Sequence, residues 1–530
     1  MMRCLFVVSC FFVFLGAKAQ SKIDYTVSRP YHDDLLLVKM LAHDTEDYVL
    51  FIRRDKNKVG IQLFNYSEMK MVANNYYKDL PKDFRIEAVR KMDGRAYLFY
   101  SVEKSSQQRL FAREIDMNQG VFVGLEKTIF DFKKEVVAPQ SRQRNDAVIS
   151  PSLMNRKFDF SLSHDERKLM VYCQVKKDGG KKVRKNVQLA YKVFDPSLGV
   201  LRKGEVSIKN LVKKTQALGG QVNKDGIPFF VTSDYTGLHL YKVSPELKIL
   251  HTLEHMGYDR GKTVCLADNS SQEIVIVANY VMTREKKQKG LSDIVLGTHY
   301  ARFDSEGKKL KDSAEEFPKS LLKKSWNTKM IFCEMLGLQL FGEDQFLAIN
   351  EERAVNISYS LQPKSGGNAT GFENKRDQMA LGGDYVITAK DSEGNTKWVR
   401  RLPKNQIPHA WHRLTAGMKH LDMGESHYFV FIDHKVNEGV LNGAENKKIK
   451  SYLTGQKSGI VYAYQVEKES GRVYRHRLFD KRNLRKGLKG TDFKMNRITK
   501  LNEKEFLIEL SRGSSSSFVV KVSVNEGSAL

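Results

Sequence analysis

The chain has 530 residues, 41% of them hydrophobic, and its 88 Lys and Arg residues against 62 Asp and Glu residues give a formal net charge of +26. The apolar fraction is too high for a disordered chain, and the mean hydropathy of -0.46 is too low for a bundle of membrane helices. A chain of this length forms either about two to four ordinary domains or one closed array of repeats. The positive charge bears on partners rather than on the fold.

The first residues have the pattern of a secretory signal peptide. Arg3 supplies a positive charge, residues 4–15 are apolar, and Ala17-Lys18-Ala19 has the small residues of a cleavage site. The apolar stretch is too short to span a bilayer well. A lipoprotein box at residues 7–10 is the alternative, but its cysteine lies inside the apolar stretch. We therefore expect export to the periplasm or to the cell surface.

We expect residues 1–19 to be removed as the signal peptide and residues 20–530 to form one domain. The sequence after the signal has no stretch of about 20 apolar residues, so no transmembrane segment is predicted. Three cysteines remain, and their odd number and wide spacing do not suggest a disulfide framework. Cys173, Cys265 and Cys333 are expected to be buried thiols.

A polar turn followed by a strongly apolar run occurs eight times after the signal. The turns are rich in Asp, Asn and Gly, and the runs are rich in β-branched and aromatic residues, which is typical of short β-strands. Both faces of each run are apolar, which indicates strands that are covered on both sides. The runs begin at Tyr48, Tyr97, Leu169, Phe229, Ile274, Phe346, Tyr428 and Phe506.

Each apolar run is followed by a second hairpin with a polar turn of its own. Two of these turns, residues 304–307 and 391–394, share the sequence Asp-Ser-Glu-Gly. Two hairpins per repeat make four strands, which is one blade of a β-propeller. The sequence therefore predicts an all-β fold, a single β-propeller of eight four-stranded blades, or of seven if one copy is irregular.

The last copy of the repeat is one strand short. After the apolar residues 518–524 and a turn, residues 527–530 are too few for a fourth strand. Residues 23–27 alternate between apolar and polar side chains before the first copy begins. We expect this N-terminal strand to complete the last blade and close the ring, because closure removes exposed sheet edges.

Two repeats resemble known propeller families. The pattern of Asp391, Gly394, Asn395 and Trp398 resembles the quinoprotein-like repeat of secreted bacterial proteins. Ser163 and Asp165, with the residues 168–172 that follow, resemble the TolB-type or WD-type repeat. These resemblances imply the architecture and carry no functional residues across. The chain departs from the quinone enzymes, because three tryptophans are too few for a full set of Trp-bearing repeats.

Several loops expected between the second and third strands are basic. Residues 176–185, for example, contain six basic residues and one Asp. Such loops share one face of a propeller, so we expect a cationic face that binds an acidic glycan, another envelope component or a protein. Simply solvated loops are the alternative, and nucleic acid is disfavoured because the loops hold few aromatic residues. The candidate binding residues are Arg53, Arg54, Lys176, Lys177, Lys181, Lys182, Arg184, Lys185, Lys286, Lys287, Lys447 and Lys448.

Histidines give two weak candidates for a metal site. Residues 251–255 match H-x-x-E-H, the inverted zinc-peptidase motif, but they alternate as in a strand, whereas the motif needs a helix. Among the five His of residues 409–434, His427 and His434 lie roughly 20 Å apart along one strand and cannot share an ion. His409 and His412 remain weak candidate ligands, and no cofactor is expected.

The sequence contains no nucleophile elbow, phosphate-binding loop or dinucleotide fingerprint. We therefore expect a monomeric, non-enzymatic binding or scaffold propeller. The alternative is a glycan-active hydrolase or lyase, in which carboxylates, His or Arg from different blades converge at the mouth of the channel. A third hypothesis, an assembly factor of the cell envelope, rests on analogy with the TolB fold.

Overall fold

The structure, a computed structural model, describes most of the chain. It covers residues 22–525 except 33, 105–106, 134, 138–156, 176–185, 210–215, 234–236, 244–246, 255–263, 283–293, 319–330, 343, 364–371, 405, 408–416, 439–451, 454–458, 482–483, 485–491 and 513–515. The signal peptide predicted at residues 1–19 lies outside the described residues and stays a prediction.

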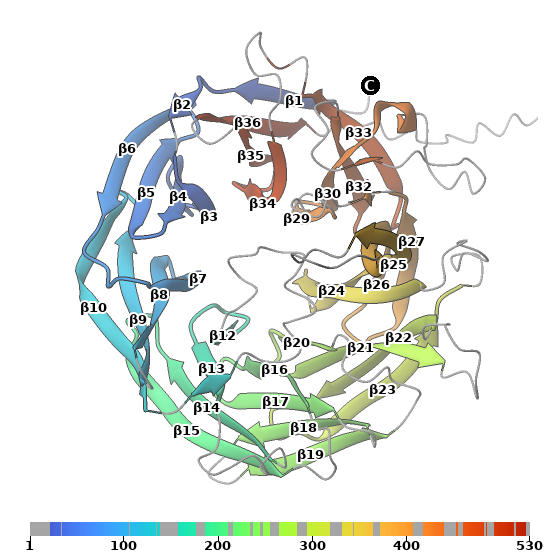
Figure 1. The fold of residues 1–530 in the computed structure, drawn as a ribbon. Helices are drawn as coiled ribbons and strands as arrows, with labels where there is room; N and C mark the ends of the chain where they lie inside the picture. The colour runs from blue at the N-terminus through green and yellow to red at the C-terminus, as the bar shows by residue number, and fades with distance from the viewer. Residues whose placement is uncertain are drawn as a thin grey trace, which may run out of the picture.

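Eight antiparallel sheets form a ring (Figure 1). In each sheet one strand lies nearest the axis, and the last lies at the rim. The innermost strands of several neighbouring blades also contact one another. The predicted all-β propeller of eight blades is confirmed, and the seven-blade alternative is wrong.

The first four blades follow one another along the chain, with strands in the order from the axis to the rim. Blade 1 consists of β3 (Leu36–Ala42), β4 (Tyr48–Asp55), β5 (Lys58–Asn65) and β6 (Lys70–Tyr77). Blade 2 consists of β7 (Arg85–Met92), β8 (Arg95–Lys104), β9 (Gln107–Asp116) and β10 (Val121–Phe132). Blade 3 consists of β12 (Asp159–Leu162), β13 (Leu169–Val175), β14 (Asn186–Phe194) and β15 (Val200–Lys209), with β11 (Val136–Val137) also paired to β13. Blade 4 consists of β16 (Gln216–Val222), β17 (Pro228–Ser233), β18 (Gly237–Val243) and β19 (Leu247–Glu254).

The last four blades repeat this order with two additions. Blade 5 consists of β20 (Val264–Asp268), β21 (Ile274–Met282), β22 (Ile294–Phe303) and β23 (Lys309–Glu316). Blade 6 consists of β24 (Ile331–Phe341), β25 (Gln345–Pro363), β26 (Phe372–Lys390) and β27 (Thr396–Leu402), extended by β28 (Gln406–Ile407) and β31 (Tyr452–Leu453). Blade 7 consists of β29 (Lys419–Met423), β30 (Ser426–Asp433), β32 (Ile460–Glu467) and β33 (Val473–Asp480), with a 3-10 turn, η4 (Lys435–Asn437). Blade 8 consists of β34 (Asp492–Lys500), β35 (Glu505–Arg512), β36 (Ser516–Asn525) and β1 (Lys22–Val27), and β2 (Tyr31–His32) also pairs with β36.

Each of the eight apolar runs forms the second strand of a blade. β4, β13 and β21 begin at the predicted residues Tyr48, Leu169 and Ile274. Every residue of β30 is buried. A second strand has a neighbouring blade on each side, so both of its faces must be apolar, which explains why the runs do not alternate.

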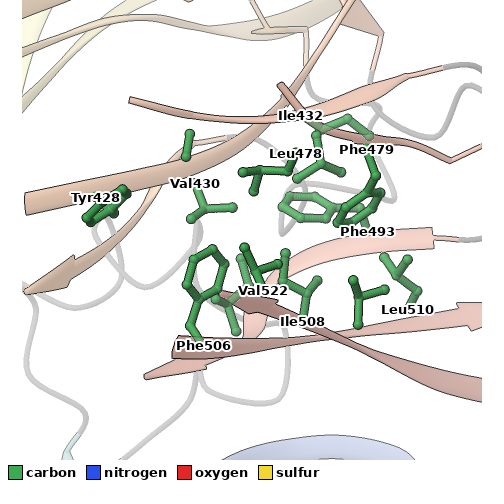
Figure 2. Packing of buried hydrophobic residues seen from close by; sticks show 14 of the residues in the cluster. Tyr428, Val430, Ile432, Leu478, Phe479, Phe493, Phe506, Ile508, Leu510 and Val522 are labelled. Carbon is green, nitrogen blue, oxygen red and sulfur yellow. The ribbon is translucent and has the colours of Figure 1, made fainter. Parts of the chain in front are cut away.

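Blades pack against one another through apolar side chains, as the junction of blades 7 and 8 illustrates. Figure 2 shows side chains of β30, β33, β34, β35 and β36 meeting in one cluster. Val430 and Phe506 within it are completely buried. A fully buried side chain of this size contributes about 1.5–3 kcal/mol relative to an exposed one. The ring is therefore held together mainly by the contacts between blades.

The N-terminal strand closes the ring. β1 pairs antiparallel with β36 from Lys22 opposite Asn525 to Val27 opposite Val520. The backbone continues the pairing, since Ser28 N donates to Val519 O at 2.9 Å. Figure 1 shows β1 at the rim of the last blade, and the predicted closure is confirmed.

The Asp-Ser-Glu-Gly turns join the third and fourth strands of blades 5 and 6. Asp391 Oδ1 accepts a hydrogen bond from Asn395 N at 2.7 Å. Gly394 has a φ of +83°, and a Cβ built on it would lie 2.0 Å from the ring of Tyr300. Trp398 Nε1 donates to Lys468 O at 2.8 Å and so ties blade 6 to blade 7. The residues that carry the resemblance to quinoprotein-like repeats thus shape turns and connect blades.

Blade 6 differs from the expectation in the length of its strands. Residues 351–377 have the polar composition of a loop, but β25 continues to Pro363 and β26 starts at Phe372, with these two residues opposite each other. The polar composition of this segment hid the strands, because the segment lacks the apolar signal used to find the others. Within the described residues, no helix is long and apolar enough to cross a membrane. Cys173 is a buried free thiol, as expected.

Candidate functional site

The two ends of the ring differ in the connections that leave them. Because all blades have the same strand order, every second strand ends, and every third strand begins, at one end of the ring. We call this the loop end, marked by Asp55 of β4 and Asp433 of β30. The opposite end, where first strands turn into second strands, is the turn end. Connections that were predicted to be basic therefore belong to the loop end.

Most predicted binding residues lie outside the described residues, and their role stays a prediction. These are Lys176, Lys177, Lys181, Lys182, Arg184, Lys185, Lys286, Lys287, Lys447 and Lys448. The weak metal candidates His409 and His412 also lie outside the described residues. The strands on either side of the basic segments, such as β13 and β14, are described and end or begin at the loop end.

Arg53 was expected on an exposed loop, but it is buried inside β4. Its guanidinium donates hydrogen bonds to Gln62 and to Glu509 of blade 8, and Arg497 Nη1 donates to the second oxygen of Glu509 at 3.0 Å. Tyr31 of β2 donates to Glu509 Oε1 at 2.6 Å. The prediction of an exposed Arg53 is wrong because β4 continues through this residue to Asp55. Its charge joins blades 1 and 8.

Arg54 is half-buried at the same end of β4. Its guanidinium lies 4.9 Å from the ring centre of Phe84 in the segment that leads to blade 2. Burial lowers the pKa of Arg54, and the nearby charge of Arg85 lowers it further. Part of the Arg54 side chain remains exposed to solvent, so Arg54 is still a candidate binding residue at the loop end.

A layer of buried polar groups lies just below the loop end. The first strands of four blades have a one-residue bulge at a similar height, and in blade 2 the extra residue is Glu87. Glu87 accepts a hydrogen bond from Ser101 Oγ at 2.6 Å. A bulge re-aims side chains and bends the strand that contains it. The second-strand residues opposite the bulges of the other three blades are Arg53, Thr232 and Asn350, all buried.

Blade 8 has the largest of these bulges. Phe493 of β34 pairs with Leu510, and Ile498 pairs with Ile508, so residues 494–497 lie opposite Glu509 alone. The sequence carries a signal for this layer that we did not use. A polar residue follows the apolar run in FFVT, FLAIN and FLIE, at Thr232, Asn350 and Glu509. Each of these residues is fully buried.

Blades 6 and 7 contribute further paired charges to the layer. Lys404 and Glu351 form an ion pair in which both side chains are buried. Arg475 Nη2 donates to Asp433 Oδ2 at 2.8 Å, and its guanidinium lies 4.2 Å from the ring centre of Tyr462. Buried charges with such partners brace a scaffold and are poor catalysts, because moving either partner leaves a buried charge behind.

Lys481 is a further buried cation at this end, and its pKa is lowered. It follows β33 at the loop end, and its side chain is buried between blades 7 and 8. Burial lowers its pKa to about 8, although the carboxylates of Asp492 and Asp480 oppose that shift. A buried amine with this pKa is partly neutral near pH 8 and can accept a proton. Lys481 is therefore a candidate for acid–base chemistry among the described groups at this end.

Two of the clustered histidines meet inside blade 7. His420 Nε2 lies 3.2 Å from His427 Nδ1, and the latter lies 3.4 Å from Asp422 Oδ1. Burial and the neighbouring His427 lower the pKa of His420 to about 3, so its ring is neutral at physiological pH. His434 instead accepts a hydrogen bond from Val436 N at 3.2 Å and caps η4. No group of three His, Cys, Asp or Glu residues in the described ranges is arranged to hold a metal ion.

The H-x-x-E-H motif lies on a strand. β19 covers Leu247–Glu254, so His251 is part of an antiparallel sheet, opposite Leu240 of β18. The expectation of a strand is confirmed for these residues, and His255 lies outside the described residues. A strand does not present the helical spacing that the zinc-peptidase motif needs.

The turn end contains a buried carboxylate that the sequence analysis missed. Asp268 ends β20, and its Oδ2 accepts a hydrogen bond from His164 N of blade 3 at 3.1 Å. Its Oδ1 has no hydrogen-bond partner among the described residues. Burial raises the pKa of Asp268 to about 7, and the charges of Asp165 and Asp225 add to that shift. The only signal was an Asp just after the apolar run of β20, which reads as an ordinary turn residue.

Comparisons with known proteins give structural likenesses only. No family model matches the chain, and no curated protein is similar to it in sequence. A prolyl endopeptidase structure has 10% identity and a TM-score of 0.41, with 91% of this chain and 55% of that chain covered, so this chain spans about half of its length. The WD40 domain of SCAP from fission yeast has 8% identity and a TM-score of 0.38 (96% and 99% covered). The polysaccharide lyase Uly1 has 9% identity and a TM-score of 0.39 (84% and 90% covered). At these TM-scores the likenesses carry no argument about function, and they include enzymes and non-enzymes.

Proposed function

We propose that the protein is an exported, non-enzymatic binding propeller that holds an anionic glycan, another envelope component or a protein partner at its loop end. The observation that carries this proposal is that three connections with clustered lysines leave the ring at the same end. Residues 176–185, 283–293 and 434–459 each join a second strand to a third strand. Their positive charges therefore add at one end of a closed ring instead of being spread around it.

The buried charges below the loop end support the same proposal. Arg53 and Arg497 are matched by Glu509, Lys404 is matched by Glu351, and Arg475 is matched by Asp433. Because these pairs largely cancel within the scaffold, the net charge of this end depends mainly on its connections. A propeller fixes the positions of the strands from which such connections leave, and this suits recognition.

Binding to dextran sulfate, an acidic glycan, tests the proposal, with neutral dextran as the control ligand. We expect saturable binding of dextran sulfate that weakens at high salt, because salt screens exposed charges. The double variant Lys181→Ser/Lys182→Ser should bind roughly tenfold more weakly or worse, since each cation near an anionic surface contributes about 1 kcal/mol. Isothermal titration calorimetry measures both effects.

The matched control is Lys308→Ser/Lys504→Ser, which removes two exposed lysines from the turn end. This variant should bind dextran sulfate like the original protein. Equal losses in the two double variants, or equal binding of neutral dextran, would contradict the proposal. Export is tested separately by fractionating cells that express the full chain and the chain without residues 1–19.

The alternative function, a glycan-active hydrolase or lyase, is favoured by one observation. Lys481 lies at the loop end with a pKa lowered to about 8 by burial, which suits a general base. If the protein cleaves acidic glycans, Lys481→Met should abolish turnover while leaving glycan binding within about threefold of the original. The measurement is the release of unsaturated or reducing ends when the original protein is incubated with acidic glycans. If no such ends are released, the enzymatic alternative is rejected and the binding function remains.

A further inference from the structure

The outermost strand of blade 1 differs from the other outermost strands in its charges. The other seven, β1, β10, β15, β19, β23, β27 and β33, each contain at least two charged residues. Lys70 is the only charged residue of β6, and the seven residues that follow it, 71–77, are uncharged. Charged side chains on edge strands discourage pairing with other chains. β6 lacks this protection over almost its whole length.

The backbone edge of β6 is open along the described residues. β6 is the last strand of its sheet, and its ladder partner is β5 on the inner side. In an antiparallel sheet, alternate N–H and C=O groups of an edge strand point away from its partner. Figure 1 shows β6 at the rim of the ring. A further strand can therefore add to blade 1 without displacing any described strand.

The side chains of β6 form a row suited to such a strand. Val72 and Tyr76 are 41% and 43% exposed, and Asn74 between them is also exposed. These residues share one face of the strand, because side chains alternate along it. Lys70 and Lys78 lie at the two ends of the same row and are exposed too. The row is thus an uncharged centre with a positive charge at each end.

A second copy of this chain is a poor occupant of the edge. An antiparallel pairing that matches residues 71–77 with themselves is centred on Asn74, and it places Lys70 of one copy opposite Lys78 of the other. Like charges directly opposite each other across two strands are destabilising. The net charge of +26 adds long-range repulsion between copies. Lys70 does contact Glu68, but both side chains are more than half exposed, and such surface pairs contribute little.

We propose that β6 is a strand-addition site for an extended segment of a partner protein. The segment has an uncharged centre and an acidic residue at each end, with eight positions from one acidic residue to the other. That spacing places the two carboxylates opposite Lys70 and Lys78, since the two lysines are themselves eight positions apart. Main-chain hydrogen bonds supply the affinity, and the lysines at the two ends set the register. This site is separate from the loop end and does not depend on the function proposed there.

Two synthetic peptides test the proposal against the full chain. Both have the same seven uncharged residues, alternating Thr and Val, and they are flanked either by Glu or by Lys at both ends. We expect the Glu-flanked peptide to bind at least tenfold more tightly in fluorescence anisotropy. Hydrogen exchange of the amides in residues 70–78 should slow when this peptide is bound, because an added strand takes up the free N–H groups.

The variant Asn74→Lys places a charge in the middle of the row and should weaken binding of the Glu-flanked peptide at least tenfold. The control is Val200→Lys on the outermost strand of blade 3, where Val200 is 51% exposed. It should leave binding unchanged. Equal affinity for the two peptides, equal binding by the two variants, or no saturable binding would overturn the proposal. A dimer seen in sedimentation that Asn74→Lys dissociates would overturn it in favour of a second copy.

Discussion

Glu509 and Asp268 are both buried carboxylates, yet their pKa values shift in opposite directions. Burial alone would raise the pKa of Glu509, but the charges of Arg53 and Arg497 outweigh it and lower that pKa. Burial raises the pKa of Asp268 to about 7, and its neighbours Asp165 and Asp225 have the same charge. Because burial raises the pKa of both carboxylates, the opposite directions come from the charges beside them, which are cationic at Glu509 and mostly anionic at Asp268.

The two sites also join blades in different ways. Glu509 connects blade 8 to blade 1 through its ion pair with Arg53, close to the strand that closes the ring. Asp268 connects blade 5 to blade 3 through one backbone hydrogen bond, with its other oxygen unpaired among the described residues. We therefore expect the junction of blades 8 and 1 to stabilise the ring and the Asp268 site to weaken it above acidic pH.

Deleting residues 21–28 should have the largest effect on this comparison. The deletion removes β1 and leaves the apolar edge of β36 exposed next to the Glu509 junction. We expect loss of the cooperative thermal unfolding transition, followed in far-ultraviolet circular dichroism, because an open ring loses both a strand and its protection against aggregation. The control is the chain that lacks only residues 1–19. An unchanged unfolding transition in the chain without residues 21–28 would contradict closure by β1.

Glu509→Gln should have the next largest effect. It leaves the guanidinium groups of Arg53 and Arg497 buried without their anion, which costs about 3–5 kcal/mol of unfolding free energy. Urea unfolding measures the change. Glu469→Gln is the control, because Glu469 is 71% exposed in its ion pair with Lys397, and its loss should change stability by less than about 0.5 kcal/mol. Similar effects of the two substitutions would show that the junction does not stabilise the ring.

Asp268→Asn should have the smallest effect and the opposite sign. The folded state keeps a proton on Asp268 up to about pH 7, whereas the unfolded state releases it near pH 4. Its contribution to stability is therefore present below about pH 4 and is lost as the pH rises to about 7. At pH 8 the substitution should stabilise the protein by about 1–2 kcal/mol, less than the full shift because a buried amide N–H also lacks a partner.

The pH profile of urea unfolding separates the two carboxylates. The gain from Asp268→Asn should largely disappear at pH 4, where the carboxyl is protonated in the folded state and about half protonated in the unfolded state. Glu509 has a lowered folded pKa, so its contribution is present above its unfolded pKa of about 4.3 and is lost as the pH falls through the folded value. A gain that stays constant between pH 4 and pH 8 would show that Asp268 is ionised throughout.

The sequence predicted the architecture because the architecture depends on local patterns. The apolar runs at Tyr48, Leu169 and Ile274 begin the strands observed, since a strand covered on both sides leaves its mark within a few residues. Closure by residues 23–27 was also predictable, because the last repeat lacked a strand. The extra length of β25 and β26 was not, because its residues have the composition of a loop.

The pairing of the charges below the loop end could not be predicted from the sequence. Arg53 and Glu509 are 456 positions apart in the chain, and the pairing depends on which side chains face each other across two blades. Arg53 also looks like part of a basic turn with Arg54. Its burial becomes evident only when β4 is seen to continue to Asp55. The same reasoning applies to Asp268, which meets a turn from two blades away.

The pairing of β1 with β36 sets the order in which the ring can be completed during synthesis. β1 is the first of the described strands to leave the ribosome, and its partner β36 is the last of them to be made. The four main strands of each of blades 1 to 7 come from one continuous segment and can form as the chain emerges, whereas blade 8 needs both the first and the last of the described strands. A chain whose synthesis stops before β36 therefore cannot form the pairing with β1, and its ring stays open.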